Sequence, residues 1–80
     1  MGIEDAVKQR IINLCAENNI TINALAVRAG IPRSTLKNII YGTSRNTGIV
    51  TIQLICDAFG MIVLEFFEDD IFKNVDAVKD

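Results

Sequence analysis

Apolar residues recur at helical spacing along most of the chain. Ile3, Val7, Ile11 and Leu14 follow one another at intervals of four, four and three, which places them on one face of a helix over residues 3–18. The same spacing, bounded by turn-forming residues, predicts four more helices, over residues 21–29, 32–41, 51–59 and 63–68. No stretch alternates apolar and polar residues as a half-buried strand does. The pattern therefore predicts an all-α fold, a compact bundle of five helices.

The second and third predicted helices form one unit over residues 21–42. Thr21 is a good N-cap residue, and Gly30 stands where a chain leaving a helix often needs a positive φ. The next helix begins at Pro32 or Arg33. Proline suits the first helical position, because its missing N–H would be unpaired there, but it leaves the helix without a side-chain cap. Gly42 ends that helix. Two helices joined by about four residues have helix-turn-helix spacing.

The remainder of the chain is less regular. Residues 43–50 are mostly polar and predict a loop, after which the fourth helix begins at Thr51. In the short fifth helix, Leu64 and Phe67 are predicted to dock on the core. From Asp69 onward, acids alternate with apolar residues, which predicts either a loosely docked turn of helix or a frayed end.

Charge is distributed unevenly, although the net charge is only −2. Residues 18–56 contain four basic residues and no acid, whereas residues 57–80 contain seven acids and two lysines. Such asymmetry marks one face for an anionic partner and leaves the other face solvated. We divide the chain into a domain over residues 1–69 and an acidic tail over residues 70–80, which we expect to take part in a dimer contact.

The chain lacks the residues that several classes of function require. The chain has no histidine, and its two cysteines, Cys15 and Cys56, are far apart and in apolar surroundings, so they form no metal-binding pattern. No nucleophile or general base accompanies the acids. No signal peptide opens the chain, and no apolar run reaches the roughly 18 residues of a membrane span. We therefore expect a cytoplasmic protein that is not an enzyme and that needs no cofactor or metal.

Three short strings in the middle of the chain have a fairly specific spacing: Leu25-Ala26, Ala29-Gly30-Ile31 and Ser34-Thr35-Leu36. With them, the chain resembles the phage-repressor/Cro family of helix-turn-helix domains, also called the xenobiotic-response-element family, over roughly residues 9–69. The resemblance implies a five-helix domain that binds double-stranded operator DNA, usually as a two-fold dimer. It makes a transcriptional repressor the leading hypothesis.

In a helix-turn-helix domain, the start of the second helix of the unit meets base edges in the major groove. The planar guanidinium of Arg33 matches O6 and N7 of guanine, and the amide of Asn38 can pair with adenine. Lys37 can reach guanine or phosphate, and Ser34 can touch a base. These four residues are the predicted base contacts.

Phosphate contacts would position the domain without reading sequence. Free amides and the dipole at the start of the second helix suit a phosphate. The predicted phosphate contacts are Thr21, Asn23, Arg28, Tyr41, Thr43, Ser44, Arg45 and Asn46. The predicted dimer contacts are Phe66, Phe67, Ile71 and Phe72.

Two other functions remain open. The chain could be the antitoxin of a toxin–antitoxin pair, which binds both DNA and a protein toxin. It could also be a protein-interaction module that kept the fold without DNA binding, because Ile22 stands where the family often has a phosphate-clamping glutamine and because the net charge is negative.

Overall fold

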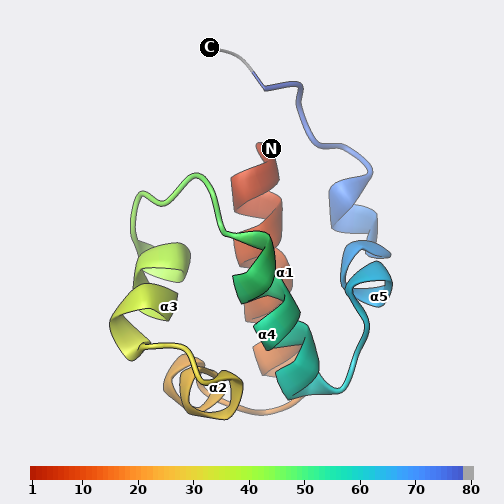
Figure 1. Ribbon diagram of the computed structural model, residues 1–80. Coiled ribbons are helices and arrows are strands. Elements are labelled where there is room, and N and C mark those ends of the chain that lie inside the picture. The colour runs from red at the N-terminus through yellow and green to blue at the C-terminus, as the bar shows by residue number, and fades with distance from the viewer. Residues whose placement is uncertain (79–80) are drawn as a thin grey trace.

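The structure is a computed structural model that describes residues 1–78. The described residues form helices and no strand. In chain order, the elements are α1 (Ile3–Glu17), α2 (Ile22–Ala29), α3 (Arg33–Tyr41), α4 (Ile49–Phe59), α5 (Val63–Phe67) and a short 3₁₀ turn, η1 (Asp70–Phe72). The all-α fold of five helices predicted from the sequence is confirmed. In Figure 1, α4 lies in front of α1, α3 lies to one side of this pair, and α5 lies to the other.

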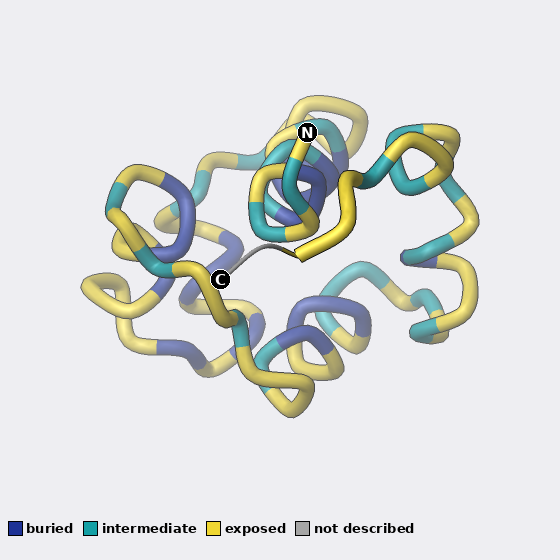
Figure 2. The backbone as a smooth tube through the Cα atoms, turned by 90° about the horizontal axis from the view of Figure 1, so that it is seen from above, coloured by how far each residue is buried: buried dark blue, intermediate teal, exposed yellow. Residues whose placement is uncertain are grey.

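A single apolar core joins the helices. Viewed from above, the buried stretches of the helices turn toward the centre (Figure 2). α2 packs against both α3 and α4, and α1 packs against α2, α3 and η1. The largest fully buried side chains are Phe66, Ile11, Leu25, Leu36, Ile55 and Cys56. Since these side chains come from all five helices, each helix, α3 included, is held by the common core.

The two cysteines are part of this core. Cys15 and Cys56 are buried and free, as the apolar pattern around them predicted. Burial raises the pKa of both thiols. They are therefore packing residues rather than reactive nucleophiles.

The ends of α2 and the start of α3 follow the predicted signals. The Thr21 hydroxyl caps α2 by accepting a hydrogen bond from the N–H of Ala24 at 3.0 Å. Gly30 ends α2 in the left-handed region with φ 70°. Helix α3 begins at Arg33, one of the two predicted starts, with Pro32 at its N-cap and, as predicted, no side-chain cap.

Two expectations about α4 and α5 are wrong. α4 begins at Ile49 rather than Thr51, because Gly48 supplies the extended cap position two residues earlier than the polar loop suggested. Leu64 does not dock, since its side chain is exposed, and Phe66 is fully buried in its place. In a helix of five residues, a rotation of the inward face by one position is enough to exchange these roles, so that Val63, Phe66 and Phe67 face the core.

The end of the chain is fastened to α1. The Arg10 guanidinium donates to the backbone oxygens of Phe66 at 2.8 Å and Glu65 at 3.1 Å, and forms an ion pair with Asp69 at 3.2 Å. Asp69 also caps η1 by accepting from the N–H of Ile71. The first residues of the predicted acidic tail are thus packed against the helical body, and the expected docked turn is the 3₁₀ turn.

Farther along the tail, Asp76 meets the start of the chain. Its carboxylate accepts from the Met1 ammonium at 2.7 Å, and its N–H donates to the Met1 carbonyl at 2.9 Å. The hydrogen bond and charge of Asp76 raise the pKa of the ammonium. Residues 79 and 80 of the predicted tail lie outside the described residues. Within residues 1–78, no helix is long and apolar enough to span a membrane.

Candidate nucleic-acid interface

The outward face of α3 carries the four predicted base contacts together with a tyrosine. All five side chains are exposed: Arg33, Ser34, Lys37, Asn38 and Tyr41. At about 100° of rotation per residue, they occupy roughly 140° of the helix circumference. The opposite face carries the core residues Leu36, Ile39 and Ile40. The structure therefore gathers the predicted base-contact residues on one continuous polar surface.

The turn between α2 and α3 fixes where this surface begins. Gly30 adopts a positive φ that L side chains rarely adopt, and the N–H of Ile31 then donates back to the carbonyl of Ala26 at 2.9 Å. Ile31 itself is buried, so the turn is anchored in the core. Arg33 consequently lies at the first helical position of α3, at its exposed end.

The other end of α3 is tied to α1. The Gly42 N–H donates to the Asn38 carbonyl, and the Lys8 ammonium donates to the Gly42 carbonyl at 3.3 Å. Gly42 has an ordinary φ of −95°, which other residues can also adopt. Glycine is needed here because a side chain would not fit, not because of the backbone conformation. A Cβ there would lie 2.6 Å from the Asn38 carbonyl oxygen and would collide with the Asn38 amide oxygen. The Asn38 amide therefore leans toward Gly42, while Arg33 and Lys37 project from the face.

The start of α2 supplies free amides beside this surface. Thr21 and Asn23 are both exposed, but the Thr21 hydroxyl is already occupied by the N–H of Ala24. The N–H groups of Ile22 and Asn23 in the first turn have no carbonyl partner within the helix. Any anion that bound here would meet these amides rather than the Thr21 hydroxyl. Arg28 is exposed in the last turn of the same helix.

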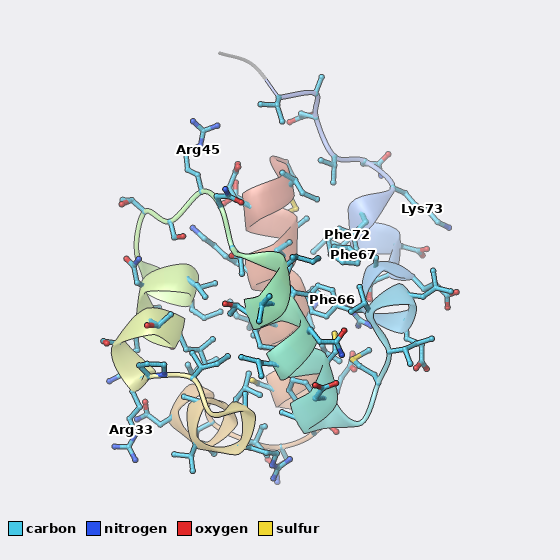
Figure 3. The ribbon with its side chains drawn as sticks, in the orientation of Figure 1. Arg33, Arg45, Phe66, Phe67, Phe72 and Lys73 are labelled. Carbon is cyan, nitrogen blue, oxygen red and sulfur yellow. The ribbon has the colours of Figure 1, made fainter. Side chains whose placement is uncertain are left out.

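The predicted phosphate contacts in the loop lie at the far end of α3. Figure 3 shows Arg45 and Arg33 at opposite ends of this side of the molecule. Thr43, Arg45 and Asn46 are exposed, and Ser44 is half-buried. The guanidinium of Arg45 lies 3.9 Å from the carboxylate of Glu4 at the start of α1. Arg45 is thus partly neutralised, unlike the cations of α2 and α3.

Three cations of the helix-turn-helix unit have no acidic partner among the described residues. Arg28, Arg33 and Lys37 take part in none of the ion pairs formed within residues 1–78. No acid occurs in the sequence between Glu17 and Asp57. Their charge is therefore uncompensated on the surface, which favours an anionic partner at α2 and α3.

The predicted dimer contacts are not all on the surface. Phe66 has no exposed area, so the expectation that it meets a second subunit is wrong. Its ring centre lies 5.0 Å from that of Phe67 and 6.0 Å from that of Phe72. Phe67, Phe72 and Ile71 are half-buried. The three rings pack on one another, and only Phe66 is removed from the surface.

Two residues that support the site were missed from the sequence. Lys8 holds the end of α3, and Arg10 holds α5 and η1. Their partners are 34 or more residues away along the chain, so no local spacing identifies them. The only sequence signal is that both cations lie on the predicted first helix near its apolar face.

Comparison with known proteins agrees with this geometry. A profile of the Cro/C1-type HTH DNA-binding domain matches residues 10–70. The crystal structure of the prophage Lp1 protein 11 is similar, with a TM-score of 0.81 and 30% sequence identity over 94% of this chain and 100% of that chain. A comparison with curated protein sequences gives no match.

Proposed function

Because this chain belongs to the Cro/C1-type family of helix-turn-helix DNA-binding domains, we propose that it recognises a specific sequence in double-stranded DNA and represses transcription there as a homodimer. The observation that carries the proposal is the outward face of α3, where Arg33, Ser34, Lys37 and Asn38 are exposed and neither cation pairs with an acid of residues 1–78. A polar face of this kind on the second helix of the unit suits the major groove.

Each residue of the face has a chemical role in the proposal. Arg33, at the first position of α3, presents two parallel donors to O6 and N7 of a guanine. Lys37 lies one turn farther on and reaches a neighbouring guanine or a phosphate. Ser34 touches a base at the start of the helix. Asn38 pairs with adenine after its amide swings away from Gly42.

Phosphates would flank this face on both sides. The free amides near Thr21 and Asn23 hold one phosphate, and Arg28 lies on the same helix. At the other end of α3, Tyr41 and the loop residues Thr43, Ser44, Arg45 and Asn46 reach the next stretch of backbone. With so few cations, each subunit neutralises only a few phosphates, so the salt dependence is shallow and useful affinity needs two subunits.

Selection of bound sequences from random double-stranded DNA tests the proposal. An enriched two-fold motif is expected, and the affinity of single-residue variants for it then tests α3. Arg33→Ala should lose about 1–3 kcal/mol and relax specificity at one base position.

Lys73→Ala is the matched control. It also removes one positive charge, but Lys73 lies on the opposite side of the molecule and pairs with Asp70. Its affinity should stay within about a factor of two of the wild type. If Arg33→Ala binds the DNA as tightly as the wild type, Arg33 does not contact the DNA. A selection that enriches no sequence would favour the protein-interaction module instead.

A further inference from the structure

The helix α4 is apolar on its outer face as well as its inner face. Ile49, Val50 and Leu54 are 65%, 69% and 37% exposed. Together with Gln53 and Asp57, they occupy one face, because positions one, four, five and eight residues apart lie on the same side of a helix. The opposite face buries Ile52, Ile55 and Cys56. A solvated helix face is usually polar and charged, so this outer face lacks a partner.

The two ends of α4 have charges that do not suit an isolated helix. Its N-terminus begins at Gly48 with no side-chain cap and no acid in the first turn, so the positive end of the dipole is uncompensated. Asp57 lies near the C-terminal end, where the dipole disfavours an acid. Within residues 1–78, Asp57 forms no ion pair and only accepts a hydrogen bond from Gln53 at 2.6 Å.

A second copy of the chain resolves both features. We infer that α4 packs antiparallel against α4 of a second subunit, with the two-fold axis passing near Gln53. Residues 49 and 57 are about 12 Å apart along the helix, so each Asp57 then meets the free amides at the start of the partner helix. Val50 and Leu54 then lie on either side of the axis and form the apolar part of this contact, and Ile49 lies at its ends. Such a contact is isologous, as two-fold symmetry requires.

The position of α4 suits the proposed DNA-binding face. In Figure 1, α4 lies in front of α1, and α3 lies to one side of it. A two-fold axis that crosses α4 at right angles and points toward the α3 side places both α3 helices on the same side of the dimer. That arrangement is what two half-sites on one DNA duplex need. The inference rests on the homodimer of the proposed function and replaces Phe66 with α4 as its contact.

Sedimentation without DNA tests the contact directly. One helix from each subunit buries less surface than a stable dimer usually needs, so the wild-type chain should dimerise reversibly, at roughly 10–500 µM. Val50→Lys places a charge in the apolar centre and should weaken dimerisation at least tenfold. Leu64→Lys is the matched control, because Leu64 is 65% exposed, close to the 69% of Val50, but lies on α5. It should leave the dimer unchanged.

The opposite outcomes overturn the inference. If Leu64→Lys dissociates the dimer and Val50→Lys does not, the contact lies on α5. If the wild-type chain stays monomeric up to about 1 mM, the inferred contact and the homodimer are both wrong. The selection experiment on α3 is unaffected by that result, so DNA binding is judged separately.

Asp57→Asn separates a dimer contact from an effect on folding. The amide oxygen can still accept from Gln53, so only the charge is removed. Loss of two symmetric charge–dipole contacts should weaken the dimer by about three- to thirtyfold. The stability of the monomer should stay the same or rise, because an acid near the C-terminus is lost. Unchanged dimerisation would refute the charge pairing.

Discussion

Arg10 fastens the end of the chain to α1, and its replacement should unfold the domain at much lower denaturant concentration. The guanidinium is buried and makes three polar contacts, to the carbonyls of Glu65 and Phe66 and to the carboxylate of Asp69. It also lies 5.8 Å from the ring centre of Phe66. Arg10→Met keeps an apolar stem of similar length but removes every donor.

The magnitude follows from what the substitution leaves behind. The hydrogen bond to the Phe66 carbonyl is buried, and an acceptor that loses a charged donor there costs about 1.5–3 kcal/mol. The bond to Glu65 is partly buried and contributes less. The Asp69 side chain is 32% exposed, so water replaces part of its pairing with Arg10. We expect a total loss of about 3 kcal/mol, which is a large share of the 4–12 kcal/mol typical of a domain this size.

Urea unfolding followed by circular dichroism at 222 nm measures this loss. Arg28→Met is the matched control, because Arg28 is exposed and has no ion pair within residues 1–78. Its stability should change by less than about 0.5 kcal/mol. A loss below about 1 kcal/mol for Arg10→Met would show that the buried hydrogen bonds do not hold α5 and η1 in place.

Three further changes test other features of the fold. Thr21→Ala removes the α2 cap and should cost about 1 kcal/mol in urea unfolding. Gly42→Ala should cost about 1–3 kcal/mol, because its Cβ would meet backbone 2.6 Å away. Gly48→Ala has no neighbour closer than 3.9 Å and should change the stability by less than about 1 kcal/mol, because the lower entropy of the unfolded chain offsets the poorer α4 N-cap. Burial raises the pKa of Cys15 and Cys56, so the folded chain keeps thiol protons that the unfolded chain releases above about pH 8.5. The free energy of unfolding should therefore fall as pH rises above that value, and Cys→Ser variants should show a smaller fall.

The sequence predicted the helices well where its signals are local. The apolar spacing of α1, the Thr21 cap and the glycine after α2 each act within a few residues, and the structure has all three. The polar face of α3 was also predictable, since an amphipathic helix of known position has only one outward side. The boundary of α4 failed because an uncapped glycine and two apolar residues resemble a loop as much as a helix start.

The features that failed or were missed depend on distant contacts. Phe66 and Leu64 differ by two positions in a short helix, and only the packing of α5 decides which one is buried. Arg10 finds its acceptors in α5 and η1, which no spacing within α1 reveals. The apolar outer face of α4 likewise cannot be recognised from the sequence, because only the structure shows which of its apolar residues are buried on the inner face.

The contacts of Arg10 also set the order in which the chain can complete its fold during synthesis. Its three acceptors lie 55, 56 and 59 residues farther along the sequence. The ribosome produces α1 first, so Arg10 stays hydrated while α2, α3 and α4 emerge. Helix α3 is therefore made before the side chain that fastens the end of the chain has any partner. If the ribosome stalled before α5 emerged, α3 would be exposed on a domain in which Arg10 had not yet formed these contacts.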